Sequence, residues 1–236
     1  MFVCFIKGNG GAMRCGPIAL YGYNMEQSKL IELTRDCARI THSNSLGYNG
    51  AILQCLAIHQ ALHTHPSSKG MIDTNAFLNS LIEKMHKVEL ETNKAETNAQ
   101  ALLPFTEKLR KVKDILNNEA KRNTYTVDKI VALLGNDISA LKSVPTAIYA
   151  ALRGQLPIDG FESNSPFVRT LFYSLSLGGD TDTIASMACS ISGALYGLDA
   201  IPRILLRHCE NNDVMDKYAD DLYRIVRSPV GSVQMQ

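Results

Sequence analysis

The chain has 236 residues, of which 45% are hydrophobic and 20% are charged. This length suits a well-buried globular domain, and the apolar fraction excludes an intrinsically disordered chain. The formal net charge is +1, so no strong general field attracts a nucleic acid or a membrane surface. We therefore expect no direct nucleic-acid binding and no membrane partner, and any binding of phosphate must come from local geometry.

Apolar residues recur at helical spacing along most of the chain, and no segment carries a convincing hairpin signal. The pattern predicts helices, in chain order, around residues 30–40, 52–62, 77–88, 104–116, 126–134, 145–154, 165–175, 184–195 and 215–226. Polar or glycine-containing connections are expected at residues 67–70, 91–100 and 154–165. The predicted fold class is all-α, as a single domain of mostly orthogonal or antiparallel helices over residues 1–236.

Single residues mark several of the expected boundaries. Thr126 can cap a helix that Gly135 ends. Pro145 suits a first helical position, and Gly154 suits the end of the same helix. A small-x-x-x-small face, made by Gly193 and Gly197, predicts close packing between helices within the core.

The cysteines and histidines give no strong signal for a disulfide or a zinc site. The six cysteines contain no Cys-x-x-Cys pair, which favours free thiols in a reducing compartment. His59 and His63 lie four residues apart, with His65 nearby, but no cysteine or carboxylate completes a zinc set at familiar spacing. We expect these three histidines to be exposed or partly buried. No apolar run is long enough to span a membrane, and residues 2–6 are too short for a signal-peptide core.

A glycine-rich segment near the start, Gly8-Asn9-Gly10-Gly11, precedes Ala12-Met13-Arg14. By itself such a segment is most often a simple turn. Because an apolar, helical pattern follows it, the backbone N–H groups are also able to face an anion at the start of a helix.

A second segment, Gly178-Gly179-Asp180-Thr181-Asp182-Thr183, carries two carboxylates behind a glycine pair. The glycines permit a sharp turn and close approach of a ligand. The oxygens of Asp180, Asp182 and Thr183 are hard donors of the kind that magnesium or calcium prefers. They precede an apolar run, so the carboxylates are expected at a helix N-terminus, where the helix dipole favours negative charge. The alternative is an ordinary helix cap.

These two segments do not stand alone. Three further segments accompany them, namely Thr41-His42-Ser43, Leu46-Gly47-Tyr48-Asn49-Gly50-Ala51 and Ser143-Val144-Pro145-Thr146-Ala147-Ile148-Tyr149. In this order along the chain, the five segments resemble the ADP-ribosylhydrolase family, which is related to the dinitrogenase reductase-activating glycohydrolases. Residues 8–14, 46–54 and 176–185 are most similar to the vertebrate branch that removes ADP-ribose from serine and trims poly(ADP-ribose). The resemblance covers nearly the whole chain from residue 8 onward.

The resemblance implies a Mg²⁺-dependent hydrolase of O-linked ADP-ribose, whose complete site holds two Mg²⁺ ions. Asp180, Asp182 and Thr183 would ligate one side of this metal pair. The expected partners are ADP-ribose, ADP-ribosylated proteins and poly(ADP-ribose), and we expect a monomer in the cytoplasm and nucleus, or in the mitochondrial matrix for full-length relatives.

The resemblance also implies the residues that bind substrate. The loop containing Gly8, Asn9 and Gly10 would hold the diphosphate of ADP-ribose. His42 would lie against the phosphates, although a histidine at a helix boundary is commonly a cap. Ile138 would line the adenosine end of the pocket, unless it is a core residue.

The start of the chain departs from the family pattern. The family places an acidic residue near a glycine-rich first helix, and a Thr-Asp-Asp cluster, well upstream of the glycine loop. We therefore expect no catalytic carboxylate in this sequence, and a chain that is incomplete at its N-terminus and poorly stable or inactive by itself. Ile6 and Lys7 also differ from the family pattern, which weakens the predicted grip on the ligand.

Three other interpretations remain open from the sequence. The chain is alternatively an inactive remnant that binds ADP-ribose, or a structural protein like the lens crystallins that share this fold. Within the family, a hydrolase of arginine-linked ADP-ribose is the nearest alternative.

Overall fold

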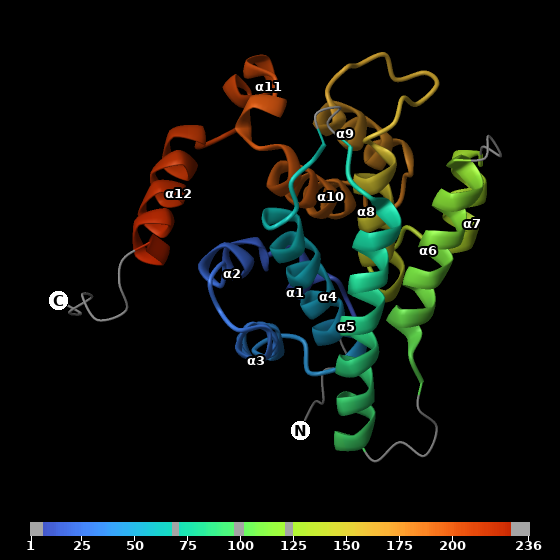
Figure 1. The fold of residues 1–236 in the computed structure, drawn as a ribbon, viewed down its shortest axis with the longest axis vertical. Coiled ribbons are helices and arrows are strands. Elements are labelled where there is room, and N and C mark those ends of the chain that lie inside the picture. The colour runs from blue at the N-terminus through green and yellow to red at the C-terminus, as the bar shows by residue number, and fades with distance from the viewer. Residues whose placement is uncertain (1–6, 68–70, 97–101, 121–124, 228–236) are drawn as a thin grey trace.

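The computed structural model describes residues 7–67, 71–96, 102–120 and 125–227. Within these ranges the elements are helices, without a strand, and the prediction of an all-α fold is confirmed (Figure 1). In chain order they are α1 (Gly10–Met13), α2 (Gly16–Tyr21), α3 (Gln27–Arg39), α4 (Ser45–Leu62), α5 (Thr74–Ala95), α6 (Pro104–Ala120), α7 (Val127–Leu134), α8 (Ala140–Arg153), α9 (Pro166–Ser176), α10 (Thr181–Tyr196), the 3-10 helix η1 (Leu198–Ala200), α11 (Arg203–Arg207) and α12 (Asn212–Arg227). None of the described helices combines the length and hydropathy that crossing a bilayer requires.

Local signals place several helix ends as expected. The Thr126 side chain accepts a hydrogen bond from the Lys129 N–H at the start of α7, and Gly135, with φ of 92°, ends that helix. Ser165 caps α9 in the same way, by accepting from the Val168 N–H. These caps satisfy backbone donors that the first turn of a helix leaves unpaired.

Two expectations about helix boundaries are wrong. Pro145 lies inside α8, which begins five residues earlier at Ala140. The first turn is held in the core because Ala140 and Val144 are fully buried, and this burial outweighs the hydrogen bond that the proline removes. Residues 91–95 continue α5 instead of connecting helices. Cys4, Ile6 and the expected connections at residues 68–70 and 97–100 lie outside the described residues.

The close packing expected at Gly193 and Gly197 is also wrong. A Cβ added to either residue would have no atom within 4 Å. Gly197 instead ends α10 with φ of 73°, in the left-handed region that favours glycine. The close helix approach occurs at Gly50 in α4, where an added Cβ would lie 2.7 Å from the Ala140 Cβ in α8.

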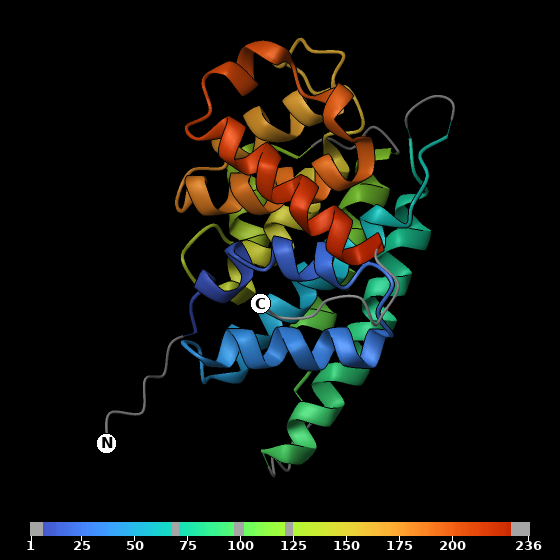
Figure 2. The same ribbon diagram turned by 90° about the vertical axis from the view of Figure 1, so that its left-hand side faces the viewer.

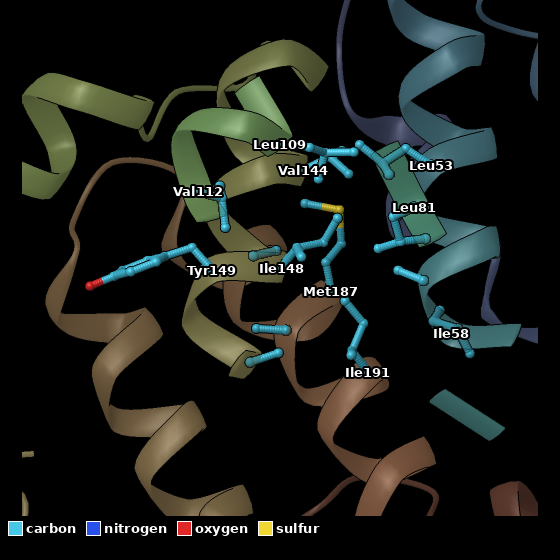
Figure 3. Close-up of a cluster of buried hydrophobic side chains, with 14 of the residues drawn as sticks. Leu53, Ile58, Leu81, Leu109, Val112, Val144, Ile148, Tyr149, Met187 and Ile191 are labelled. Carbon is cyan, nitrogen blue, oxygen red and sulfur yellow. The ribbon is translucent and has the colours of Figure 1, made fainter. Parts of the chain in front are cut away.

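The core forms where α4, α8 and α10 pack against one another. Of the 18 residues of α4, 13 are buried, and 11 of the 14 residues of α8 are buried. Figure 3 shows side chains from α4, α5, α6, α8 and α10 converging, among them Leu53, Leu81, Leu109, Ile148 and Met187. Gln54 in this core donates from Nε2 to the Met187 carbonyl over 2.9 Å. The functional loops described below leave from the ends of these helices.

The C-terminal helix α12 lies at the edge of the molecule, alongside α2 (Figures 1 and 2). It has no buried residue. A cavity of about 650 Å³ separates the two helices, with Leu20 and Tyr23 on one side and Leu222 and Val226 on the other. The apolar face of α12 is therefore only partly covered.

The described cysteines are all free, but they differ in exposure. Cys15 and Cys55 are buried, Cys37 and Cys189 are intermediate, and Cys209 is exposed. Burial raises the pKa of the Cys189 thiol to about 12, so this thiol is protonated and unreactive at neutral pH.

Candidate functional site

Three loops that are distant in sequence meet at one end of the core. Residues 7–9 precede α1, residues 135–139 connect α7 to α8, and residues 177–180 connect α9 to α10. Backbone hydrogen bonds join the first loop to the second, from the Asn9 N–H to the Ile138 carbonyl at 2.9 Å and from the Ala140 N–H to the Lys7 carbonyl at 3.0 Å. The second loop is joined to the third by the Asp180 N–H, which donates to the Asn136 carbonyl at 2.8 Å.

The side chain of Asn9 connects the first loop directly to the third. Its Nδ2 donates to Asp180 Oδ2 at 2.6 Å and to Ser143 Oγ at 3.0 Å. An amide nitrogen has two protons, so both are used, and the bond to a carboxylate is the stronger kind. Asn9 is buried. The glycine-rich loop and the aspartate corner are thus one unit, although Asn9 and Asp180 are 171 positions apart.

The aspartate corner is not an ordinary helix cap. Asp180 occupies the N-cap position of α10, but its side chain makes no capping hydrogen bond. Asp182, in the first turn, is exposed and accepts from the Thr183 N–H through Oδ1 at 2.9 Å. Gly178 and Gly179 both have positive φ, 67° and 68°, a conformation that glycine adopts without strain. The chain therefore turns sharply just before Asp180.

The chemistry of these donors fits a hard divalent cation. Asp180, Asp182 and Thr183 supply two carboxylates and a hydroxyl from the start of one helix, and Mg²⁺ prefers such oxygens. Within the part of the chain that the structure describes, no three His, Cys, Asp or Glu side chains gather to hold a metal. The corner is therefore a partial ligand set, which water or other oxygens would have to complete around Mg²⁺.

His42 lies beside the glycine-rich loop. A Cβ added to Gly10 would be 3.0 Å from His42 Cε1, so any larger residue at this position would press on the imidazole. His42 is buried, and this burial, with the positive charge of Arg14, lowers its pKa. The imidazole is therefore neutral at pH 7.

The protonation of the two His42 nitrogens follows from its neighbours. Nδ1 lies 2.7 Å from Thr41 Oγ1, and Thr41 Oγ1 accepts from Arg14 Nη2 at 2.6 Å. The Thr41 hydroxyl has a single proton and two possible acceptors, His42 Nδ1 and the Ala38 carbonyl oxygen, which is 3.5 Å away. The contact with Nδ1 is the shorter one, and a Thr41 proton donated to Nδ1 would leave the imidazole proton on Nε2, on the side of Gly10.

Ile138 is not a core residue, because its side chain is 70% exposed. Its carbonyl holds Asn9, and the adjacent Ser139 pairs with Gly8 in an isolated antiparallel bridge. The structure thus brings Gly8, Asn9, Gly10, His42, Ile138 and Asp180 to one region, with Asp182 and Thr183 in the first turn of α10. Their roles toward metal and substrate stay predictions.

Two residues of this region carry no predicted role, Asn136 and Ser143. Ser143 is buried, accepts from Asn9 and donates from Oγ to the Ser139 carbonyl at 3.0 Å. Two hydroxyl residues at helical spacing, Ser143 and Thr146, within a mostly apolar helix are a sequence signal that could have pointed to it. Asn136 follows Gly135 in a turn, and nothing in its local sequence indicates its distant partners.

The histidines His59, His63 and His65 do not join this site. His59 and His63 lie near the C-terminal end of α4, where the His63 ring stacks on Tyr23 with 4.3 Å between ring centroids. His63 and His65 are exposed and His59 is half-buried. The expectation that these histidines are exposed or partly buried is confirmed.

Comparison with known proteins identifies the family. The sequence profile of the ADP-ribosylglycohydrolase family matches residues 4–230. The chain belongs to this family. It is 40% identical over 223 residues to ADP-ribosylhydrolase ARH3 of Homo sapiens and of Bos taurus, in alignments that cover 92% of this chain and 58% of each relative. The resemblance predicted from the separate motifs is confirmed.

More distant similarity supports the fold of the family. A solved structure described as an ADP-ribosylglycohydrolase-related protein complex superposes with a TM-score of 0.61 at 22% identity, covering 93% of this chain and 61% of that one.

ARH3 of Gallus gallus is 41% identical over 224 residues, which is 57% of its length. The chain therefore spans somewhat more than half the length of the curated relatives that it matches.

Proposed function

We propose that this chain forms the nucleotide-binding loops and one metal-binding corner of a Mg²⁺-dependent hydrolase. Its substrate would be O-linked ADP-ribose, on serine and in poly(ADP-ribose). Family membership supports ADP-ribose as the ligand, and relatives that are 40% identical to this chain carry the name ADP-ribosylhydrolase. The observation that carries the proposal is the 2.6 Å bond from Asn9 to Asp180, because it joins a loop suited to phosphates to a corner suited to a cation.

The glycine-rich loop would bind the diphosphate. Glycines let phosphate oxygens approach the backbone closely. The neutral His42 imidazole would donate a hydrogen bond from Nε2 to a phosphate oxygen. The exposed Ile138 side chain offers an apolar surface to adenosine.

The aspartate corner would hold the ribose end through Mg²⁺. Asp180, Asp182 and Thr183 would be ligands, and Asn9 would keep the Asp180 carboxylate from rotating. Bound Mg²⁺ orients a sugar and lowers the pKa of a coordinated water. Hydrolysis also needs a group that moves protons, and we assign that role to none of the described residues. Binding and turnover therefore require separate tests.

Calorimetry with ADP-ribose, with and without Mg²⁺, tests binding. We expect binding that Mg²⁺ strengthens, and we expect Asp182→Asn to reduce the Mg²⁺-dependent part about tenfold or more, because it removes a charged ligand from an exposed position. Asp199→Asn, at an exposed residue in η1, is the matched control and should leave binding unchanged. Absence of any ADP-ribose binding would contradict the proposal and favour a structural role.

Release of ADP-ribose from modified peptides tests turnover. The proposal expects release from a serine-modified peptide and from poly(ADP-ribose), but not from an arginine-modified peptide. Release from the arginine-modified peptide instead would assign the chain to the other specificity of the family. Binding without release from any substrate would leave an ADP-ribose-binding protein without hydrolase activity.

A further inference from the structure

The loop of residues 135–139 contacts both of the other loops, and Asn136 is its point of contact with the aspartate corner. The Asn136 carbonyl accepts from the Asp180 N–H at 2.8 Å, and Asn136 Nδ2 donates to the Leu177 carbonyl at 2.9 Å. These two bonds span the turn from both ends, because Leu177 precedes the glycine pair and Asp180 follows it. One residue thus fixes the entry and the exit of the turn.

The glycine pair packs closely on Asn136, and the two glycines differ in this contact. A Cβ added to Gly179 would lie 2.1 Å from the Asn136 carbonyl oxygen and 2.7 Å from its Cγ. A Cβ added to Gly178 would come no closer than 3.8 Å to Asn136 Nδ2. Only the second glycine is therefore required for the approach of Asn136.

The loop that carries Asn136 is itself held in place. Thr146 Oγ1 in α8 lies 2.7 Å from the Gly135 carbonyl oxygen and 2.6 Å from the Lys142 carbonyl oxygen, so its single proton is shared between the two acceptors. Lys142 Nζ pairs with Asp137 Oδ2 at 2.7 Å, and Asp137 Oδ1 accepts from the Ser139 N–H at 2.9 Å. Asn136 is thus anchored to the first turns of α8, which belong to the core.

We propose that Asn136 is a positioning residue that sets the direction of the Asp180 carboxylate. It does so by clamping the Leu177–Asp180 turn against α8, while Asn9 holds the carboxylate from the other side. The inference rests on the proposed function in so far as Asp180 is a metal ligand. Residues that orient a metal ligand from behind commonly change metal affinity 10- to 100-fold when they are replaced.

A pair of glycine variants tests the contact. Gly178→Ala and Gly179→Ala both place an alanine at a positive φ of nearly the same value, 67° and 68°, so both strain the backbone. Only Gly179→Ala collides with Asn136. We expect the affinity for Mn²⁺, measured by calorimetry on the full chain, to fall at least tenfold further in Gly179→Ala than in Gly178→Ala. Equal losses would overturn the proposal, because the strain of the turn would then explain both.

The variant Asn136→Ala removes the side-chain bond of the clamp without adding a steric collision. It tests the role of Asn136 even if Gly179→Ala fails to fold. Asn136→Ala deletes the bond to the Leu177 carbonyl and is expected to weaken Mn²⁺ binding about tenfold, while ADP-ribose affinity without metal changes less than twofold. Asn93→Ala is the matched control, because Asn93 Nδ2 donates to the Leu102 carbonyl over 2.8 Å. Equal metal affinities of the two variants would overturn the proposal.

Hydrogen exchange at the Asp180 amide gives a readout that needs no metal. We expect this amide to exchange several-fold faster in Asn136→Ala than in Asn93→Ala or the unmodified chain. If the unmodified chain binds no metal, the metal-binding part of the proposed function fails, and exchange alone decides the inference. Unchanged exchange at Asp180 would then overturn it.

Discussion

The helices α8 and α12 have similar lengths and are both amphipathic, yet they are stabilised very differently. Eleven of the 14 residues of α8 are buried, while none of the 16 residues of α12 is buried. In α12, Met215, Tyr218, Tyr223 and Ile225 are large apolar residues that stay exposed. The comparison teaches that an amphipathic pattern predicts a helix but does not say whether its apolar face is covered, and the covering supplies most of the stability.

This difference bears on function because of where the site is attached. Asn9, the 135–139 loop and Asp180 leave from or contact α8 and α10, which belong to the core, whereas α12 contacts the molecule through α2. Substitutions in α12 should therefore leave the geometry of the site unchanged, whereas equivalent substitutions in α8 should disrupt it.

The largest effect on stability is expected when an isoleucine is replaced by alanine in α8, compared with the same replacement in α12. Ile148→Ala in α8 removes a fully buried side chain, and Ile225→Ala in α12 removes one that is 49% exposed. We expect the first to lower the free energy of unfolding by about 3–4 kcal/mol and the second by no more than about 0.5 kcal/mol. Urea denaturation measures both. Similar losses would show that α12 is packed as tightly as the core.

Smaller effects on the free energy of unfolding, opposite to each other in sign, are expected when two glycines are replaced by alanine. An added Cβ at Gly154, at the end of α8, would lie 2.2 Å from Thr170 Oγ1 and 2.9 Å from the Thr170 nitrogen. Gly154→Ala should therefore destabilise the protein by about 2–3 kcal/mol.

The matched glycine lies within α10, where an added Cβ at Gly193 would meet no atom. Gly193→Ala should stabilise the protein by about 0.5–1 kcal/mol, because alanine has less freedom to lose in a helix. Thermal unfolding of both variants measures the contrast. Destabilisation by Gly193→Ala would mean that this face of α10 is covered in solution.

The smallest effect is expected in the pH dependence of stability, through His59 in the last turn of α4. Burial lowers the pKa of His59, with further lowering by the charges of His63 and Lys84. Since the unfolded chain takes up this proton near pH 6.5 and the folded chain only at lower pH, the stability is fully present above pH 6.5. It is lost as the pH falls through the lower, folded-state value.

A variant isolates this contribution. His59→Gln should flatten the dependence of melting temperature on pH between about 7 and 5, while His65→Gln, at an exposed position, should not. His42 has a lowered pKa as well, so part of the dependence should remain in both variants. An unchanged slope in His59→Gln would refute this assignment.

The sequence predicted what depends on neighbouring residues. Both ends of α7 were foreseen because Thr126 and Gly135 act within one turn. Pro145 misled the boundary of α8, because the burial of Ala140 and Val144 against other helices is not visible in a local pattern. The exposure of the Ile138 side chain was also not predictable from the local pattern, since the same loop suits a core residue or an exposed one.

The candidate site shows the same limit. Its motifs identified Asp180 and the loop around Asn9, but not that these two side chains bond across 171 positions. Asn136 was missed because its partner Leu177 is 41 positions away. The roles of Asp182, Thr183 and His42 toward metal and phosphate are still predictions, since only a bound ligand tests them.

The exposure of Cys209 provides a practical way to label the molecule next to α12. Its thiol lies between α11 and α12, whereas Cys15 and Cys55 are inaccessible inside the fold. A maleimide dye should therefore react first with Cys209 among the described thiols, without any engineered residue. Fluorescence anisotropy of that dye would report how tightly the C-terminal helix is held as nucleotide or magnesium is added.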